Sequence, residues 1–147
     1  FKPPEIGGKV KIHQDSSYLY TEPLSCTGFW IPNDDVDKEN GCMWFLPGSH
    51  KFNLLTRSIR NEKDQIYYDP PIDRDILDKL YPHELFVPIE IKKGGLVIFH
   101  GNLIHKSDEN KSNKSRHAYS FHIIDGTTKW VNTNWLQYPD NDKFDDV

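Results

Sequence analysis

The sequence predicts an all-β fold, a two-sheet jelly roll of the double-stranded β-helix, cupin-like kind, with one minor helix. Short apolar or alternating runs recur along the chain, turn-forming residues separate them, and only one stretch has helical periodicity. The length of 147 residues suits a single domain, since domains commonly have about 100–150 residues.

Seven strands are expected, each bounded by turn residues, as after the third run at Pro47-Gly48. Their ranges are 9–15, 24–31, 42–46, 85–91, 96–100, 103–107 and 116–125. A jelly roll has about eight strands. The first strand is therefore expected to be missing from an N-terminally truncated domain spanning residues 1–147.

Residues 52–82 are read as a polar insertion into this domain. Its one helix-like patch covers residues 73–81, where Asp73 is placed to cap the helix. Three apolar residues are expected to share the buried face of that helix: Ile76, Leu77 and Leu80. Because the insertion is long and polar, it is expected to close over a ligand site as a lid or wall.

Composition excludes several classes of function. The net charge is −4, and no run of Lys and Arg indicates a nucleic-acid or membrane-surface partner. No apolar stretch approaches the roughly 20 residues of a membrane-spanning helix. Two cysteines, Cys26 and Cys42, form no disulfide framework, which predicts a reducing, intracellular location in the cytoplasm or, alternatively, the peroxisome. The expected partner is a small-molecule substrate.

His13, Gln14 and Asp15 suggest a metal site. On a strand, side chains two residues apart share a face, so His13 and Asp15 would point into the same space. His105, which follows a strand far downstream, is a candidate third ligand. Two histidines and one carboxylate are typical of non-haem iron(II) oxygenases. The alternative interpretation of His13 and Asp15 is a local ion pair on a surface strand.

Arg116 lies at the start of the next strand, eleven residues after His105. Its planar guanidinium can bind both oxygens of a carboxylate and stays charged when buried, as the far carboxylate of 2-oxoglutarate would require. Ser107, on the same face as His105, could donate to that carboxylate. The alternative for Arg116 is a solvent-facing charge.

Several motifs together resemble the phytanoyl-CoA dioxygenase family. They are residues 13–24, Trp30-Ile31-Pro32, residues 39–42, residues 47–51, Phe99-His100-Gly101, His105-Lys106-Ser107, Asn110, Arg116 and Tyr119. The resemblance covers nearly the whole chain except the insertion. It is greatest to the phytanoyl-CoA dioxygenase domain-containing proteins.

The resemblance implies an Fe(II)- and 2-oxoglutarate-dependent dioxygenase that hydroxylates a small organic or fatty acyl substrate and releases succinate and CO2. His13, Asp15 and His105 match the iron ligands, and Arg116, Ser107 and Trp30 match the cosubstrate pocket. O2 is the co-reactant, and ascorbate is a candidate supporting reductant. Trp30 is also a candidate core residue.

Four further histidines are not expected to bind metal. His50 and His100 are assigned structural, hydrogen-bonded roles, and His117 and His122 are read as ordinary strand residues. Two alternatives to the dioxygenase remain: a non-catalytic jelly-roll module that binds a metal or ligand, and a jelly-roll sugar-nucleotide isomerase. The binding module predicts the loss of one metal ligand or of Arg116, and the isomerase would need no 2-oxoglutarate anchor.

Overall fold

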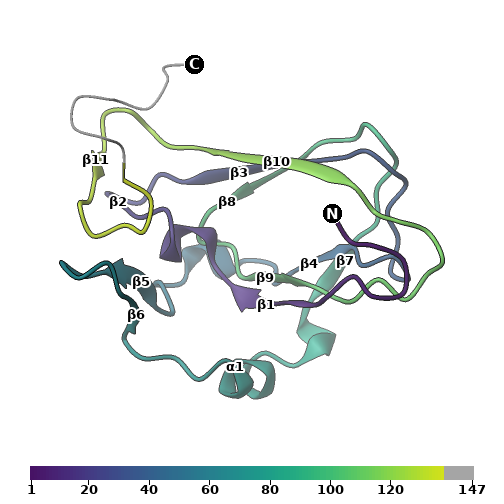
Figure 1. The fold of residues 1–147 in the computed structure, drawn as a ribbon, viewed down its shortest axis with the longest axis horizontal. Coiled ribbons are helices and arrows are strands. Elements are labelled where there is room, and N and C mark those ends of the chain that lie inside the picture. The colour runs from purple at the N-terminus through teal and green to yellow at the C-terminus, as the bar shows by residue number, and fades with distance from the viewer. Residues whose placement is uncertain (138–147) are drawn as a thin grey trace.

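The computed structural model describes residues 1–137, so residues 138–147 of the predicted domain lie outside the described part. Two antiparallel sheets form two layers (Figure 1). One sheet contains, in order, β1 (Val10–His13), β9 (His105–Ser107), β4 (Met43–Phe45) and β7 (Val87–Ile89). The other contains β10 (Ala118–Ile123), β3 (Thr27–Pro32) and β8 (Val97–His100). The predicted all-β jelly roll is confirmed.

These seven strands of the two sheets correspond to the seven predicted runs. Four further strands were not predicted. β2 (Thr21–Glu22) pairs with β11 (Lys129–Trp130), and β5 (Arg57–Arg60) pairs with β6 (Ile66–Asp69). Each of these ladders is formed by only two strands, so most of their side chains gain little burial and leave a weak pattern in the sequence.

Alternation along the strands directs one face of each sheet into the space between them. In β3, Gly28, Trp30 and Pro32 are buried, while the residues between them are only partly buried. Phe99 of β8 packs against Phe45 of β4 across the layers, with ring centroids 5.2 Å apart. This interlayer space contains part of the core and the polar residues described below.

The insertion contains α1 (Arg74–Leu80), and the Asp73 side chain caps it by accepting from the Asp75 N–H at 2.9 Å, as predicted. The predicted buried face is wrong in part. Leu77 is buried, whereas Ile76 and Leu80 are exposed. The helix presents one apolar residue to the core rather than three.

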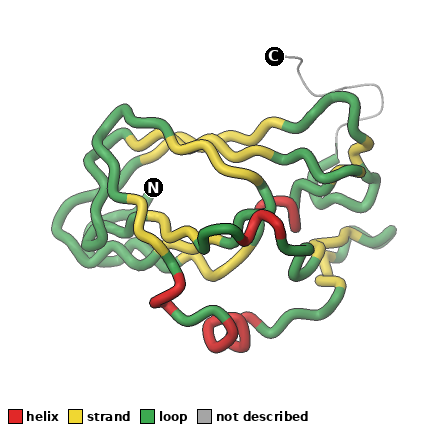
Figure 2. Tube along the Cα trace, turned by 180° about the vertical axis from the view of Figure 1, so that it is seen from behind, coloured by secondary structure: helices red, strands yellow, loops and turns green. Residues whose placement is uncertain are grey.

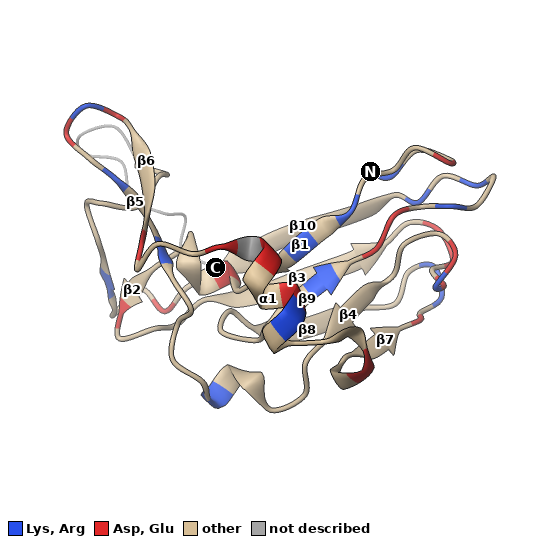
Figure 3. Ribbon diagram, turned by 90° about the horizontal axis from the view of Figure 1, so that it is seen from below, with Lys and Arg blue, Asp and Glu red and all other residues tan. Residues whose placement is uncertain are grey.

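The helix lies outside the four-stranded sheet, against β1 (Figures 1 and 2). Lys9 pairs with Asp78 at 3.5 Å, and Lys11 of β1 pairs with Asp75 at 3.4 Å. Figure 3 shows acidic stretches of α1 beside a basic stretch of β1. The helix of the insertion therefore covers part of the outer face of this sheet. The hairpin of β5 and β6 contacts instead the 3-10 helix η1 (Asp15–Ser17), which follows β1. In the described part of the chain, no helix has the length and apolar character needed to span a membrane.

Candidate metal centre

Antiparallel pairing of β1 with β9 brings the first two candidate ligands together. His13 is the register partner of His105, and their ring centroids lie 4.1 Å apart. Both rings are largely shielded from solvent, His105 almost completely. Residues 92 positions apart in the sequence thus share one end of the sheet, as the sequence analysis expected.

Asp15 reaches the same place by a different route from the predicted one. It does not continue the strand, because β1 ends at His13 and Asp15 begins η1. The turn rotates Gln14 into a fully buried position and directs the Asp15 carboxylate towards the two imidazoles. The expectation that His13 and Asp15 share a strand face is therefore wrong, although the two side chains converge.

Glycine at position 101 allows η1 to pack closely against the turn between β8 and β9. The Ser16 N–H donates to the Gly101 carbonyl at 3.0 Å, and the Gly101 N–H donates to the Cys26 carbonyl at 2.7 Å. A Cβ at position 101 would lie 2.5 Å from Ser16 Oγ and 2.7 Å from Cys26 Cβ, closer than nonbonded atoms approach. This contact fixes the helix that carries Asp15.

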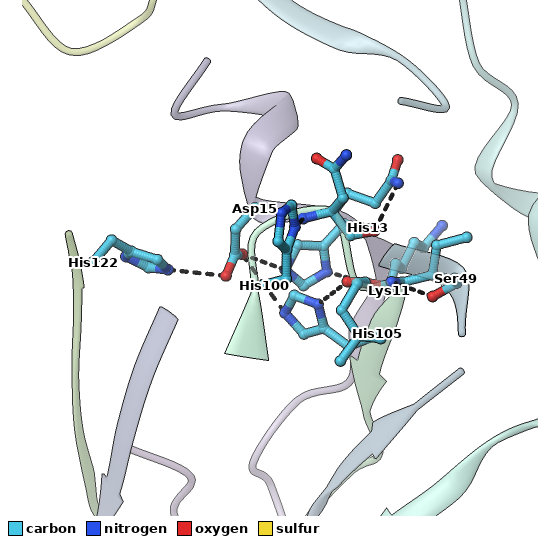
Figure 4. A network of polar contacts seen from close by, with 11 residues as sticks. Lys11, His13, Asp15, Ser49, His100, His105 and His122 are labelled. Carbon is cyan, nitrogen blue, oxygen red and sulfur yellow. Dashed lines mark hydrogen bonds and ion pairs between the residues drawn. The ribbon is translucent and has the colours of Figure 1, made fainter. Parts of the chain in front are cut away.

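Backbone carbonyls orient both imidazoles. His13 Nδ1 bonds the Lys11 carbonyl at 2.8 Å, and His105 Nδ1 bonds the Leu103 carbonyl at 2.9 Å (Figure 4). A carbonyl only accepts, so each Nδ1 carries the proton and each Nε2 has a free lone pair. The two Nε2 atoms lie 3.4 and 3.6 Å from Asp15 Oδ1.

The three candidate ligand atoms, one each from His13, Asp15 and His105, all lie within 4.8 Å of one another. Neighbouring ligands of an octahedral ion with bonds of about 2.1 Å lie about 3 Å apart. The observed spacings therefore require only small shifts for all three atoms to reach one ion. Two imidazole nitrogens and a carboxylate oxygen form a donor set that suits iron(II).

The electrostatics keep His105 and Asp15 in the form that binds a metal. Burial, followed by the adjacent His13 imidazole, lowers the pKa of His105 to about 4, so His105 is neutral at pH 7. Burial alone would raise the pKa of Asp15, but the hydrogen bond from His122 and the adjacent imidazoles of His13 and His105 hold that pKa well below its usual range. His105 therefore presents a neutral nitrogen to the site, and Asp15 presents an ionised carboxylate.

His122 was read as an ordinary strand residue, and the structure corrects this. Its Nε2 lies 2.9 Å from Asp15 Oδ2, on the opposite side of the carboxylate from His13 and His105 (Figure 4). The sequence pattern does not indicate this contact, because the apolar residues Tyr119, Phe121 and Ile123 would be expected to face the core. They are exposed, and His122 points inward.

The predicted cosubstrate residues are also buried. Ser107 is two residues after His105 in β9, and Trp30 is on the inner side of β3. Arg116 is buried, with its guanidinium carbon 5.3 Å from the centre of the Trp30 ring. The alternative of a solvent-facing Arg116 is wrong.

Arg116 makes few hydrogen bonds for a buried cation. Its Nη2 donates to the Gly41 carbonyl at 3.3 Å, and within residues 1–137 its Nε has no hydrogen-bond partner and no carboxylate pairs with the guanidinium. Burial lowers its pKa without removing its charge. A buried guanidinium with unused donors fits the carboxylate of a ligand.

Lys2 is a second buried cation near Arg116, and the sequence analysis did not identify it. The two residues exchange backbone hydrogen bonds of 2.9 and 3.0 Å, and Lys2 Nζ donates to the Gly8 carbonyl. Burial, followed by the charge of Arg116, lowers the pKa of Lys2 to about 8. The two cations make this part of the interior attractive to an anion.

The remaining histidines differ from one another. His100 has the expected structural role, since its Nδ1 accepts from the Asn102 N–H at 3.0 Å. His50 is exposed, with its ring 6.1 Å from that of His100, and its hydrogen-bonded role stays a prediction. His117 pairs with Asp34 at 2.8 Å on the surface, away from the metal-ligand candidates.

Comparison with known proteins agrees with the geometry. The fold and the two-histidine, one-carboxylate cluster define a jelly-roll protein with a candidate metal site. A model of the family described as "Phytanoyl-CoA dioxygenase (PhyH)" matches residues 1–118. The chain belongs to the phytanoyl-CoA dioxygenase family, and the resemblance seen in the sequence is confirmed.

Two relatives illustrate the match. Phytanoyl-CoA dioxygenase 1 of Oryza sativa subsp. japonica is 49% identical over 93% of this chain and 47% of its own length. Phytanoyl-CoA dioxygenase domain-containing protein 1 of Danio rerio is 45% identical over the same shares. The chain thus spans about half the length of the curated relatives that it matches.

Solved structures support the same fold. The α-ketoglutarate-dependent carbocyclase SnoK from nogalamycin biosynthesis superposes with a TM-score of 0.71 at 24% identity, over 88% of this chain and 49% of SnoK. EvdO2 from Micromonospora carbonacea var. aurantiaca, solved with 2-oxoglutarate, gives 0.64 at 22% identity, over 93% and 55%. At these identities the likeness concerns the fold alone.

Proposed function

We propose that this chain carries the catalytic centre of an Fe(II)- and 2-oxoglutarate-dependent dioxygenase that hydroxylates a small organic or fatty acyl substrate. The observation that carries the proposal is the convergence of His13, Asp15 and His105, whose ligand atoms lie within 4.8 Å of one another. The name of the family and the names of its members support the dioxygenase class.

In this proposal His13 Nε2, His105 Nε2 and Asp15 Oδ1 would hold iron, and the cosubstrate and dioxygen would bind at positions that these three atoms do not fill. When bound, iron supplies the activation of dioxygen, with CO2 and succinate as products of the cosubstrate. The chain supplies the orientation of the ligands and a site largely shielded from water.

Arg116 is proposed to bind the far carboxylate of 2-oxoglutarate, with Ser107 as a second donor and Trp30 as part of the wall. Its burial supports this role, as does its Nε, which has no hydrogen-bond partner among residues 1–137, since a carboxylate would supply the missing acceptor. Lys2 adds positive charge next to it. The hairpin of β5 and β6, which contacts η1, is the part of the insertion proposed to border the substrate.

Titration calorimetry with Mn2+, a redox-silent substitute for iron, tests the proposal. We expect the protein to bind Mn2+ and then to bind 2-oxoglutarate only when the metal is present. Metal binding followed by no cosubstrate binding would contradict the proposal and would fit a metal-binding module or an isomerase. With Fe2+ and O2, succinate should form from 2-oxoglutarate.

A further inference from the structure

The two oxygens of the Asp15 carboxylate have different partners. Oδ1 faces His13 Nε2 at 3.4 Å and His105 Nε2 at 3.6 Å. Oδ2 accepts a hydrogen bond of 2.9 Å from His122 Nε2, which comes from the opposite sheet (Figure 4). A single side chain thus joins the two layers at the candidate metal site.

The register of β10 explains why His122 points inward. It pairs with Gly28 of β3, whose neighbours along the inner face of that strand are buried. Gly28 has no side chain, and an added Cβ would lie 2.6 Å from the Phe99 ring. The imidazole therefore meets no β3 side chain on its way to Asp15. It keeps 31% side-chain exposure, so it is not part of the packed core.

His122 is not a fourth member of the ligand cluster. Within residues 1–137, the atoms that lie within 4.8 Å of one another come from His13, Asp15 and His105. His122 contacts instead the carboxylate oxygen that faces away from the two histidines. Its geometry is that of a residue that orients a ligand.

We propose that His122 is a positioning residue that keeps Asp15 a monodentate ligand, which binds the metal through Oδ1 alone. This inference rests on the proposed function. A six-coordinate ion held by three protein atoms has three positions left, two for a chelating cosubstrate and one for dioxygen. If Asp15 bound through both oxygens, only two positions would remain. The N–H of His122 donates a hydrogen bond to Oδ2 and so keeps this oxygen off the ion, which leaves the third position open.

The test compares three variants: His122→Met, His122→Gln and His117→Leu. Met and Gln have similar length and shape, but only the amide of Gln can donate to Asp15 Oδ2. His117 belongs to another His–Asp pair, with Asp34, and lies on the surface, so its variant serves as the control. Thermal unfolding verifies that each variant is folded, and calorimetry measures Mn2+ affinity and then 2-oxoglutarate affinity of the Mn2+-loaded protein.

We expect His122→Met to lose about tenfold or more in 2-oxoglutarate affinity, in the usual range for a residue that orients a metal ligand. His122→Gln should recover most of that loss, and His117→Leu should match the wild type. A loss below tenfold in His122→Met, or an equal loss in His122→Gln, would overturn the inference while leaving the proposed function intact. If the wild type itself binds Mn2+ without binding 2-oxoglutarate, the proposed function fails and the inference fails with it.

Discussion

The side-chain carbonyl of Gln14 accepts a hydrogen bond of 2.8 Å from the backbone N–H of Leu55. Gln14 is fully buried, and its Nε2 donates to the Asn102 carbonyl at 2.8 Å. Gln14, which lies between His13 and Asp15, therefore connects the segment that carries these two candidate ligands to the start of the insertion and to the turn between β8 and β9. The insertion thus supports the site as well as covering a sheet.

Replacing Gln14 with Leu should destabilise the protein by about 2–4 kcal/mol, because the Leu55 N–H and the Asn102 carbonyl would lose their partner. Urea denaturation measures the free energy of unfolding. Gln65→Leu is the control, since Gln65 is exposed in the β5–β6 hairpin. Equal stability of the two variants would contradict the proposed bracing role.

His105→Ala should abolish tight binding of Mn2+ and, with Fe2+, the formation of succinate, because it removes one of three ligands from the cluster. Calorimetry and succinate release are the measurements. His117→Ala, a change at a surface histidine, should leave both unaltered. Retention of wild-type metal affinity in His105→Ala would refute the assigned ligand set.

Arg116→Ala should leave Mn2+ affinity unchanged and weaken 2-oxoglutarate binding by about 2–5 kcal/mol, the usual loss when one partner of a buried charge pair is removed. Arg116→Lys should fall in between, because it keeps the charge and loses the planar fork. Calorimetry on the Mn2+-loaded protein measures both. Arg60→Ala, at a surface pair with Asp64, provides the control. A loss of metal binding in Arg116→Ala would place Arg116 in a different role.

Leu77→Ala should cost about 2–4 kcal/mol of stability by leaving a cavity in the core. Leu77 is 4% exposed, whereas Leu80, three residues later in α1, is 63% exposed. Leu80→Ala should therefore change the free energy of unfolding little. Equal effects in chemical denaturation would mean that α1 does not pack through Leu77.

The lowered pKa of Lys2 predicts that the stability of the protein depends on pH. Burial first, and Arg116 second, lower its pKa from 10.5 to about 8 in the folded protein. Between these values the unfolded chain binds more protons, so this residue makes stability rise as pH increases from about 8 to 10.5. We expect a contribution of about 1 kcal/mol, reduced by partial hydration of the ammonium group.

The measurement is the difference in unfolding free energy between wild type and Lys2→Met, at pH values on both sides of that interval. Burial raises the pKa values of the Cys26 and Cys42 thiols to about 12 and 11, so these thiols make stability fall as pH increases. Both proteins contain the thiols, so their contribution cancels in the difference. A difference that stays constant with pH would show that Lys2 is not desolvated.

The strands of the two main sheets were predictable because alternation and turn residues are local properties. The strand 118–123 shows the limit. Its apolar residues Tyr119, Phe121 and Ile123 are exposed, and its polar His122 contacts the site. A period of two identifies a strand, but only the partner strand decides which face is inside.

The sequence by itself determined the fold class, the family and the three residues whose ligand atoms come together, because strand patterns and motif spacing are properties of the sequence alone. Only the tertiary structure decided that Asp15 reaches the cluster from a 3-10 helix, that His122 bonds its second oxygen, and that Lys2 lies beside Arg116. Each of these depends on contacts between residues far apart in sequence. Such contacts follow from strand register and from the turn that ends β1 at His13, two residues earlier than predicted, and no local pattern specifies them.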